Sequence, residues 1–443
     1  MSIIADKTFT TKALIKFVLW SFLLSFPFAR AQALEKRSPV WHLMGYGQSL
    51  SLGVLGIPAL TTDSSADDIM FSSGIRRPIQ GRPEDDFFKP LAETNTGSRG
   101  ETGVAAAVEM FRLTLAEMGR VSPSALDFEI LGSSAGRAGA SISGLLPGSK
   151  NYQGLLDDVK EGLYLADEEQ RSYRYLATLW SNGETDQLKG TDRSAYISRL
   201  QTLAGSVRSH VSHVSKGSWQ PPLLAYQPSS HRTYLARRKP ITPETPEIAL
   251  AIREAAHSSD GIYCIMPLYW GDFVDGIHAT NYTYQQIGKY YGRALARLFY
   301  ANENNLPLPA LALDLEKANW IDKRVFLKFS VPHPPIVFDT KWVKEASNMG
   351  FDLWKPNGEL DRNAISNVSI VSANEVAVTF ANEPSQGSRL SYAFGRPDDP
   401  MTGGRMDGPR GNLRDSDTGS YTVKDGGIRN LYNWSLIFEV IKP

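Results

Sequence analysis

The chain has 443 residues, of which 42% are hydrophobic and 21% are charged. That apolar content supports a sizeable core and excludes wholesale disorder, and the length predicts about two to three domains at roughly 100–200 residues each. Basic and acidic residues number 47 each, so no net positive charge favours nucleic-acid binding. The single cysteine, Cys264, excludes a disulfide within the chain and any zinc site built from several cysteines.

Residues 1–33 carry the pattern of a secretory signal peptide. Three lysines precede the apolar run 17–28, and the sequence Ala-Gln-Ala at 31–33 supplies small residues for cleavage. A membrane anchor is the alternative, but the run is shorter than the roughly 20 residues that a spanning helix needs, and Pro27 interrupts it. We therefore expect export to a bacterial periplasm or exterior, without stable membrane insertion after cleavage.

Residues 34–303 alternate short apolar runs with helical patterns. Continuous apolar runs are typical of strands buried on both faces, and strands that alternate with helices predict a parallel sheet covered on both faces. The predicted strands are 41–45, 127–132, 175–181, 222–227 and 261–267. The predicted helices are 102–118, 194–214, 246–257 and 284–300.

The pattern changes near residue 304. Helical periodicity largely disappears there, and the remaining apolar runs indicate a β-sandwich over 304–443. Its predicted strands are 325–329, 335–338, 368–372, 376–380, 390–394 and 434–440. A stretch rich in glycine, aspartate and arginine at 395–428 predicts a long loop, and such loops are often functional or disordered. Its arginines either meet an acidic polysaccharide or are simply solvated.

Four short segments place polar groups at the ends of predicted strands, where ligands gather in open α/β sheets. The first presents Ser49 on a glycine-containing turn, where a hydroxyl can attack an acyl carbon once a base removes its proton. The second, 132–142, is rich in small residues whose backbone N–H groups can stabilise an oxyanion. It lacks the Gly-Lys-Ser/Thr ending of a phosphate-binding loop, and an ordinary turn is its alternative interpretation.

The third segment, 180–186, contains an amide and two carboxylates. Asn182 can direct its amide N–H groups at the same oxyanion. Glu184 and Asp186 invite a glycosidase interpretation, but their spacing does not by itself place them across a sugar. We expect them to hold the loop or to interact with Arg137.

The fourth segment contains Asp275 and His278. Histidine is a suitable general base near neutral pH, and a carboxylate three residues earlier can reach back to fix its tautomer. His231, which follows a predicted strand, is the alternative base. Ser133 and Ser134 are less favoured nucleophiles because no Gly-x-Ser-x-Gly elbow surrounds them.

The order and spacing of these segments resemble the SGNH hydrolase superfamily. The similar branch is that of the carbohydrate O-acetylesterases of the sialate O-acetylesterase and acetylxylan esterase type. Gly47-Gln48-Ser49 matches the Gly-Gln-Ser that opens that branch, although Leu50 stands in the place of its asparagine. Residues 180–186 match its Trp-x-Gln-Gly-Glu-x-Asp block with Asn182 in the glutamine position, and 275–278 matches its Asp-x-x-His.

The resemblance implies an α/β fold, with a three-layer α/β/α, flavodoxin-like catalytic domain at 34–303 built on a five-stranded parallel sheet. A C-terminal β-sandwich domain at 304–443 would follow. By position, Ser49 would be the nucleophile, His278 its base and Asp275 the residue that orients the base. The implied oxyanion donors are the N–H of Ser49, the N–H of Gly139 or alternatively Gly136, and the side chain of Asn182. The residues expected at the substrate are Gln48, Glu184 and Arg137.

The implied activity is that of an exported serine esterase that removes O-acetyl groups from a carbohydrate or polysaccharide through an acetyl-enzyme intermediate. The expected partner is an acetylated glycan, and no metal or organic cofactor is implied. Two alternatives remain open at this point. One is a polysaccharide O-acetyltransferase that uses the same triad, and the other is a non-catalytic glycan-binding protein.

Overall fold

The computed structural model describes residues 37–63, 67–77, 83–214, 219–235 and 245–443. Ser38–Pro443 form one compact unit. The signal peptide predicted at 1–33 lies outside the described residues. Within the described ranges, no helix combines the length and the apolar character that crossing a bilayer requires.

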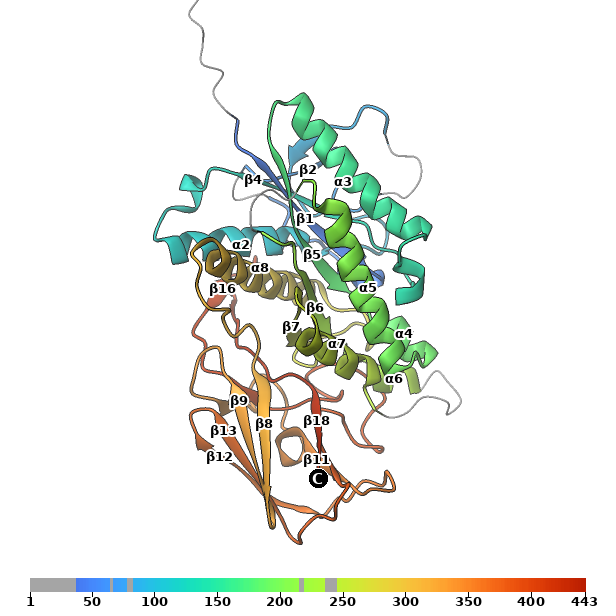
Figure 1. Ribbon diagram of the computed structural model, residues 1–443, viewed down its shortest axis with the longest axis vertical. Helices are drawn as coiled ribbons and strands as arrows, with labels where there is room; N and C mark the ends of the chain where they lie inside the picture. Colours follow the sequence, from blue (N-terminus) through green and yellow to red (C-terminus); the bar gives the residue numbers. More distant parts are fainter. Residues whose placement is uncertain (1–36, 64–66, 78–82, 215–218, 236–244) are drawn as a thin grey trace, which may run out of the picture. The chain divides into compact units, whose positions relative to one another are not determined.

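A seven-stranded sheet forms the centre of the first two thirds of this unit (Figure 1). The strands lie in the order β3-β2-β4-β1-β5-β6-β7, in which β3 is antiparallel to β2 and every other neighbouring pair is parallel. Their bounds are β1 Val40–Gly47, β2 Ile69–Phe71, β3 Phe88–Pro90, β4 Glu129–Ser134, β5 Tyr173–Ser181, β6 Leu223–Gln227 and β7 Ile262–Pro267. The fold is therefore mixed α/β with a mostly parallel sheet, as the sequence predicts.

The sheet has two strands more than the five that the sequence analysis predicted. All five predicted strands are present as β1, β4, β5, β6 and β7. The additional strands, β2 and β3, have three residues each and lie at one edge of the sheet. Three residues are too few to establish an apolar run or an alternation, so the pattern gave no signal for them.

Helices cover both faces of the sheet (Figure 1). Leu43 of β1 packs into the core that includes α2 and α8, whereas Val40 and Met44 enter the core formed with α3, α5 and α7. The longer helices are α2 Val104–Gly119, α3 Lys150–Glu168, α5 Arg193–Val211, α7 Glu247–Ser258 and α8 Asn281–Glu303. The shorter ones are η1 Ser49–Leu52, η2 Pro123–Ala125, η3 Ile142–Leu145, α4 Glu184–Lys189 and α6 His231–Leu235. The four predicted helices are present, while α3 was not anticipated.

The residues after α8 form antiparallel sheets. A four-stranded sheet has the order β12-β13-β9-β8, and a three-stranded sheet has the order β11-β14-β18. The rings of Phe329 on β9 and Phe438 on β18 lie 5.9 Å apart and join the two sheets. We call residues 304–443 the β-rich region.

The β-rich region contains more strands than the six that the sequence predicted. The principal ones are β8 Asp314–Ile321, β9 Arg324–Ser330, β11 Phe351–Trp354, β12 Ile365–Ser372, β13 Glu375–Phe380, β14 Arg389–Tyr392 and β18 Phe438–Ile441. Two smaller pairs are β10 Val337–Phe338 with β15 Leu413–Arg414, and β16 Ser420–Thr422 with β17 Ile428–Asn430. A 3-10 helix, η4, spans Ser347–Gly350. The stretch predicted as one long loop at 395–428 therefore contains β15 and β16 and the start of β17.

Helices α2 and α8 approach each other through glycine. A Cβ atom on Gly292 would overlap the carbonyl oxygen of Ala107 and would lie 2.7 Å from the nitrogen of Phe111. A Cβ on Gly288 would overlap the carbonyl oxygen of Gly103 in the same way. Because backbone atoms cannot move aside as flexible side chains do, this helix pair depends on glycine at both positions.

We predict that Gly292→Ala destabilises the fold by about 1–3 kcal/mol, because the added methyl group overpacks a backbone contact. Gly205→Ala is the matched control, since Gly205 lies in the exposed middle of α5 and a Cβ there meets no atom within 4 Å. Removing that helical glycine should stabilise the protein by about 0.5–1 kcal/mol. Urea unfolding measures the free energy of unfolding of both variants. Equal changes in that free energy for the two substitutions would contradict the packing argument.

Candidate active site

Ser49, His278 and Asp275 form one continuous hydrogen-bonded chain. The Nδ1–H of His278 donates to Asp275 Oδ2 at 2.9 Å, and in that tautomer its Nε2 accepts from the Ser49 hydroxyl at 2.9 Å. The serine follows β1, and the other two residues lie between β7 and α8. Such an arrangement allows an imidazole to take a serine proton while the carboxylate fixes its orientation.

The turn after β1 presents Ser49. β1 ends at Gly47, which has a φ of 147° and whose Cβ, if present, would overlap the carbonyl oxygen of Ser181. Ser49 then begins the 3-10 helix η1, so its N–H has no partner within that helix. The serine is only 7% exposed. Its hydroxyl is therefore held at the edge of the sheet with a backbone donor beside it.

The turn between β7 and α8 orients the histidine. Asp275 Oδ1 accepts hydrogen bonds from the N–H groups of Ile277 at 3.0 Å and His278 at 2.8 Å, which fixes the turn. Burial opposes ionisation of Asp275, but these bonds and the bond from the His278 ring together lower its pKa below the ordinary value. The carboxylate therefore remains ionised and acceptor-only beside the imidazole.

The second segment contributes Gly136 and Gly139, which lie in different surroundings. A Cβ on Gly136 would overlap the hydroxyl of Ser51, so this glycine packs directly on η1. The next residue, Arg137, donates its N–H to the carbonyl oxygen of Gly47 at 2.9 Å. Gly139 is exposed, with no atom within 4 Å of its Cβ position. The structure thus places Gly136, not the favoured Gly139, against the turn that carries Ser49.

Asn182 is held by a tyrosine that no motif signalled. The hydroxyl of Tyr196 donates to Asn182 Oδ1 at 3.1 Å and accepts from the indole N–H of Trp180 at 3.2 Å. The Asn182 amide donates to the carbonyl oxygen of Ala140 at 3.0 Å and approaches Gln48 Oε1 at 3.4 Å. The second contact is longer than an ordinary N–H···O bond, so that N–H is the less tightly bound of the two in this 1% exposed side chain.

Two of the three residues expected at the substrate, namely Gln48 and Glu184, are buried. Gln48 is 2% exposed, and its side-chain oxygen accepts from the N–H of Thr185 at 3.1 Å. Glu184 is 1% exposed. Both residues therefore support the segment after β5 and present little surface to a ligand.

Arg137, the third such residue, is exposed. The ion pair expected between it and Glu184 or Asp186 does not form within the described ranges. Asp186 instead accepts from the N–H of Ile142 at 2.7 Å and from the hydroxyl of Thr191 at 2.9 Å. It therefore holds the loop, which was the other expectation, and its burial gives no support to a glycosidase role.

Glu184 is a buried acid close to the histidine. Burial raises its pKa to about 7, while a hydrogen bond from its own N–H, a hydrogen bond from Tyr226 and the charge of His278 act in the opposite direction. The Tyr226 hydroxyl donates to Glu184 Oε1 at 3.0 Å. Its Oε2 has no hydrogen-bond partner among the described residues. This carboxyl group therefore titrates near neutral pH.

The alternative catalytic residues are engaged elsewhere. The Nε2–H of His231 donates to the carbonyl oxygen of Phe394 at 2.8 Å, and burial lowers the pKa of His231 to about 4. Ser133 lies 2.8 Å from Nε2 of His42 in a fully buried pair. Ser134 donates to the carbonyl oxygen of Ser51 at 2.7 Å.

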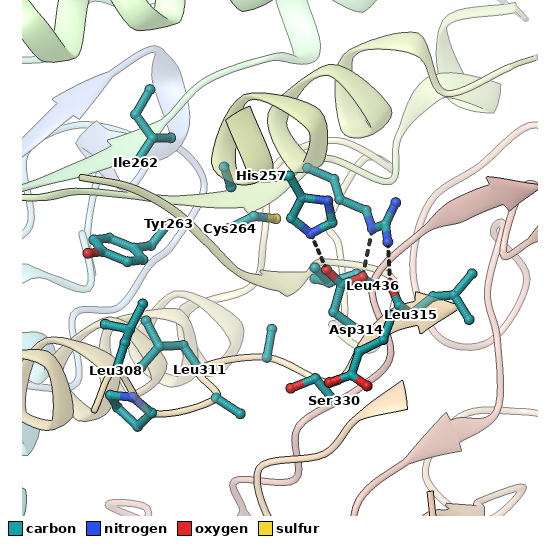
Figure 2. Close-up of a pocket in the computed structure, with 16 residues that line it drawn as sticks. His257, Ile262, Tyr263, Cys264, Leu308, Leu311, Asp314, Leu315, Ser330 and Leu436 are labelled. Atoms are coloured by element: carbon teal, nitrogen blue, oxygen red, sulfur yellow. Dashed lines mark hydrogen bonds and ion pairs between the residues drawn. The ribbon is translucent and has the colours of Figure 1, made fainter. Parts of the chain in front are cut away.

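A cavity of about 510 Å³ lies elsewhere, between α7, β7 and the start of the β-rich region (Figure 2). Figure 2 shows His257 directed at Asp314. The carboxylate of Asp314 lies 2.6 Å from the Nε2 of His257 and 2.6 Å from the Nε of Arg253. Burial raises the pKa of the Cys264 thiol in its wall, so the thiol stays protonated. This ion cluster is already satisfied and offers no activated nucleophile. Across the described ranges, no three histidine, cysteine or carboxylate side chains are grouped to hold a metal ion.

Comparison with solved structures finds the same fold in a carbohydrate acetylesterase from Xanthomonas citri, with a TM-score of 0.54 and 15% sequence identity over 91% of this chain and 80% of the other. A protein from Arabidopsis thaliana overlays with a TM-score of 0.38 and 15% identity over 58% of this chain and 98% of its own. NanS overlays with a TM-score of 0.36 and 11% identity over 53% of this chain and 78% of its own.

No family model matches the chain, and no curated protein matches it. The fold shared with the Xanthomonas citri protein extends over the α/β part and the β-rich region, because the overlay covers 91% of this chain. The resemblance to carbohydrate acetylesterases that the four segments indicated is thereby confirmed at the level of the fold.

We predict that Glu184→Gln changes how stability depends on pH. The ordinary pKa is 4.5 and the pKa in the fold is about 7, so the folded chain binds more protons between these values and loses stability as pH rises through them. The loss attributable to Glu184 is on the order of 3 kcal/mol. Urea unfolding at several pH values from about 4.5 to 8 measures it. Parallel stability curves for the variant and the unmodified protein would contradict this assignment.

Proposed function

We propose that this chain is an exported carbohydrate O-acetylesterase that acts through Ser49, His278 and Asp275. The hydrogen-bonded chain of these three side chains, with both links at 2.9 Å, carries the proposal. The fold shared with a carbohydrate acetylesterase supports an acetylated glycan as substrate. The export signal predicted at 1–33 supports a periplasmic or extracellular location, where acetylated polysaccharides are accessible.

The first half of the reaction acetylates the serine. The Ser49 hydroxyl attacks the carbonyl carbon of the acetyl ester while His278 Nε2 takes its proton. The ionised Asp275 stabilises the imidazolium that forms. When the tetrahedral intermediate collapses, the ester C–O bond breaks, and His278 returns the proton to the departing sugar oxygen. The products of this half are a free sugar hydroxyl and acetyl-Ser49.

The second half releases acetate. Water attacks the carbonyl carbon of acetyl-Ser49 as His278 takes one of its protons. The second tetrahedral intermediate then expels the serine oxygen, which recovers the proton from His278. No other group needs to change its protonation state over the full cycle.

The oxyanion of both intermediates needs donors on one side of Ser49. We assign this role to the N–H of Ser49, the N–H of Gly136 and the side chain of Asn182. Gly136 replaces Gly139 in this proposal because it packs on η1, whereas Gly139 is exposed. Asn182 is one methylene shorter than the glutamine of the similar branch, and the bond from Tyr196 supports its orientation.

The two alternative functions are distinguished from the esterase by different observations. A non-catalytic glycan-binding protein has no use for a serine, a histidine and a carboxylate in hydrogen-bonded sequence, so the geometry disfavours it. An acetyltransferase uses the same three groups and differs only in whether a sugar hydroxyl replaces water in the second half. Product analysis with and without an acceptor glycan distinguishes the transferase from the esterase.

Ser49→Ala should abolish hydrolysis of a chromogenic acetate ester and of acetylated polysaccharides, because the group that accepts the acetyl is removed. We expect kcat to fall by at least about 10³-fold. Ser133→Ala is the matched control, since it removes another buried hydroxyl that is hydrogen-bonded to a histidine. Acetate release by Ser49→Ala at the unmodified rate would refute the proposed function.

Asn182→Ala should lower kcat by about 10²–10³-fold with a smaller change in KM, because a donor is lost mainly in the transition state. Tyr196→Phe keeps the amide but removes the hydroxyl that orients it. It should therefore show an intermediate loss. A kcat of Asn182→Ala within about threefold of the unmodified value would exclude Asn182 as an oxyanion donor, provided that the melting temperatures agree.

A further inference from the structure

The segment 271–282 carries Asp275 and His278, and the β-rich region holds the start of that segment. The N–H of Arg405 donates to the carbonyl oxygen of Gly271 at 3.0 Å. The Nε of the same arginine donates to Asp272 Oδ1 at 2.8 Å. One residue of the β-rich region thus binds both the backbone and a side chain just before the turn of the histidine.

The end of the same segment is held through a second arginine. The guanidinium of Arg429 lies over the ring of Tyr282, 5.4 Å from its centre. The hairpin of β16 and β17, which supplies Arg429, lies beside α8 (Figure 1), where the Gln286 amide donates to the carbonyl oxygen of Asn430 at 3.0 Å. The start of α8 is therefore fixed from the β-rich region as well.

Both arginines stack on Trp342. Their guanidinium carbons lie 4.4 Å and 4.9 Å from the centre of the Trp342 ring, for Arg405 and Arg429 respectively. Arg405 also donates to the carbonyl oxygen of Trp342 at 2.8 Å, and the Trp342 indole N–H donates to the carbonyl oxygen of Trp270 at 3.1 Å. We call Trp342, Arg405 and Arg429 the tryptophan cluster.

The turn that contains Gly276 packs its backbone directly against the backbone of the β-rich region. A Cβ on Gly403 would overlap the carbonyl oxygen of Gly276, the residue after Asp275. The hydroxyl of Thr402 lies 3.1 Å from the Cβ position of Gly276. The hydroxyl of Thr233, from α6, donates to the carbonyl oxygen of Gly276 at 3.0 Å. The turn therefore has little room to move outward.

Hydrogen bonds inside the segment connect its held ends to the histidine. The N–H of Thr280 donates to the carbonyl oxygen of Asp272 at 3.0 Å. The N–H of Val274 donates to the carbonyl oxygen of His278 at 2.8 Å. Because these bonds pair the two sides of the turn, a displacement at Asp272 is transmitted to the backbone of His278.

We propose that the tryptophan cluster positions the catalytic base, with Arg405 as the positioning residue that sets the His278–Ser49 distance. This inference rests on the proposed function and assigns a role in catalysis to the β-rich region. The Arg405 and Asp272 side chains are 24% and 38% exposed, so their ion pair alone contributes little to stability. The effect comes instead from placing the imidazole, since a shift of about 1 Å can cost about 10²-fold in rate.

Arg405→Ala should lower kcat on a chromogenic acetate ester by about 10- to 100-fold with KM changed by less than about threefold. The rate at which a fluorophosphonate labels Ser49 should fall by a similar factor, because the same base activates the serine in that reaction. Arg405→Lys retains the charge and should recover part of kcat, since it restores the ion pair with Asp272 but not the planar stack on Trp342.

Arg389→Ala is the matched control. Arg389 is also in the β-rich region, pairs with Glu439 at 3.3 Å, stacks 5.3 Å from the centre of Trp354 and has a side chain that is 26% exposed. It has no contact with the segment 271–282 in the described structure. We expect its kcat and labelling rate to stay within about twofold of the unmodified enzyme.

Equal kcat and labelling rates for Arg405→Ala and Arg389→Ala would overturn the proposal. If Arg405→Ala does not fold, Asp272→Asn tests the ion pair with Arg405 and Arg405→Lys tests the stack on Trp342, and unmodified kcat in both would overturn the proposal as well. Ser49→Ala in the same assay separates the two proposals. An inactive Ser49→Ala alongside a fully active Arg405→Ala refutes only the positioning role, whereas an active Ser49→Ala refutes the proposed function.

Discussion

The hydrogen bond between His278 Nε2 and Ser49 Oγ joins two turns that are 229 residues apart in the chain. It forms because β1 and β7 lie in one parallel sheet, which brings the carboxyl ends of its strands to a common edge. A parallel sheet in turn requires helices on both faces, and the close contact of α2 with α8 fixes the helix that directly follows the histidine. The chemistry therefore depends on how accurately the whole sheet is built.

Buried apolar runs made the five longer strands of the sheet predictable, and the order of the motifs predicted that Ser49, Asp275 and His278 lie at one edge of it. Both expectations rest on local patterning and on strand ends that meet at one edge of the sheet. The short strands β2 and β3 were not predicted, because three residues are too few to show a period. β8 was not predicted either, because few of its side chains are buried and it therefore lacks an apolar run.

The surroundings of the three groups were less predictable. Tyr196 orients Asn182 from the first turn of α5, fourteen residues later in the chain, and no spacing rule signals such a contact. Gln48 and Glu184 occupy motif positions, yet burial turned them inward, and burial is a property of the folded packing rather than of the motif. Arg405 was one arginine among several in a polar stretch, and only the fold shows that it meets Asp272.

The distance along the chain between Ser49 and His278 has a consequence for a chain that is still being made. At about 5–20 residues per second, the histidine leaves the ribosome roughly 10–50 seconds after the serine, and the arginine that we assign to its support follows later still. A nascent or truncated polypeptide thus carries a chemically ordinary alcohol. On the proposed function, full reactivity therefore requires that the last third of the molecule has been synthesised and packed.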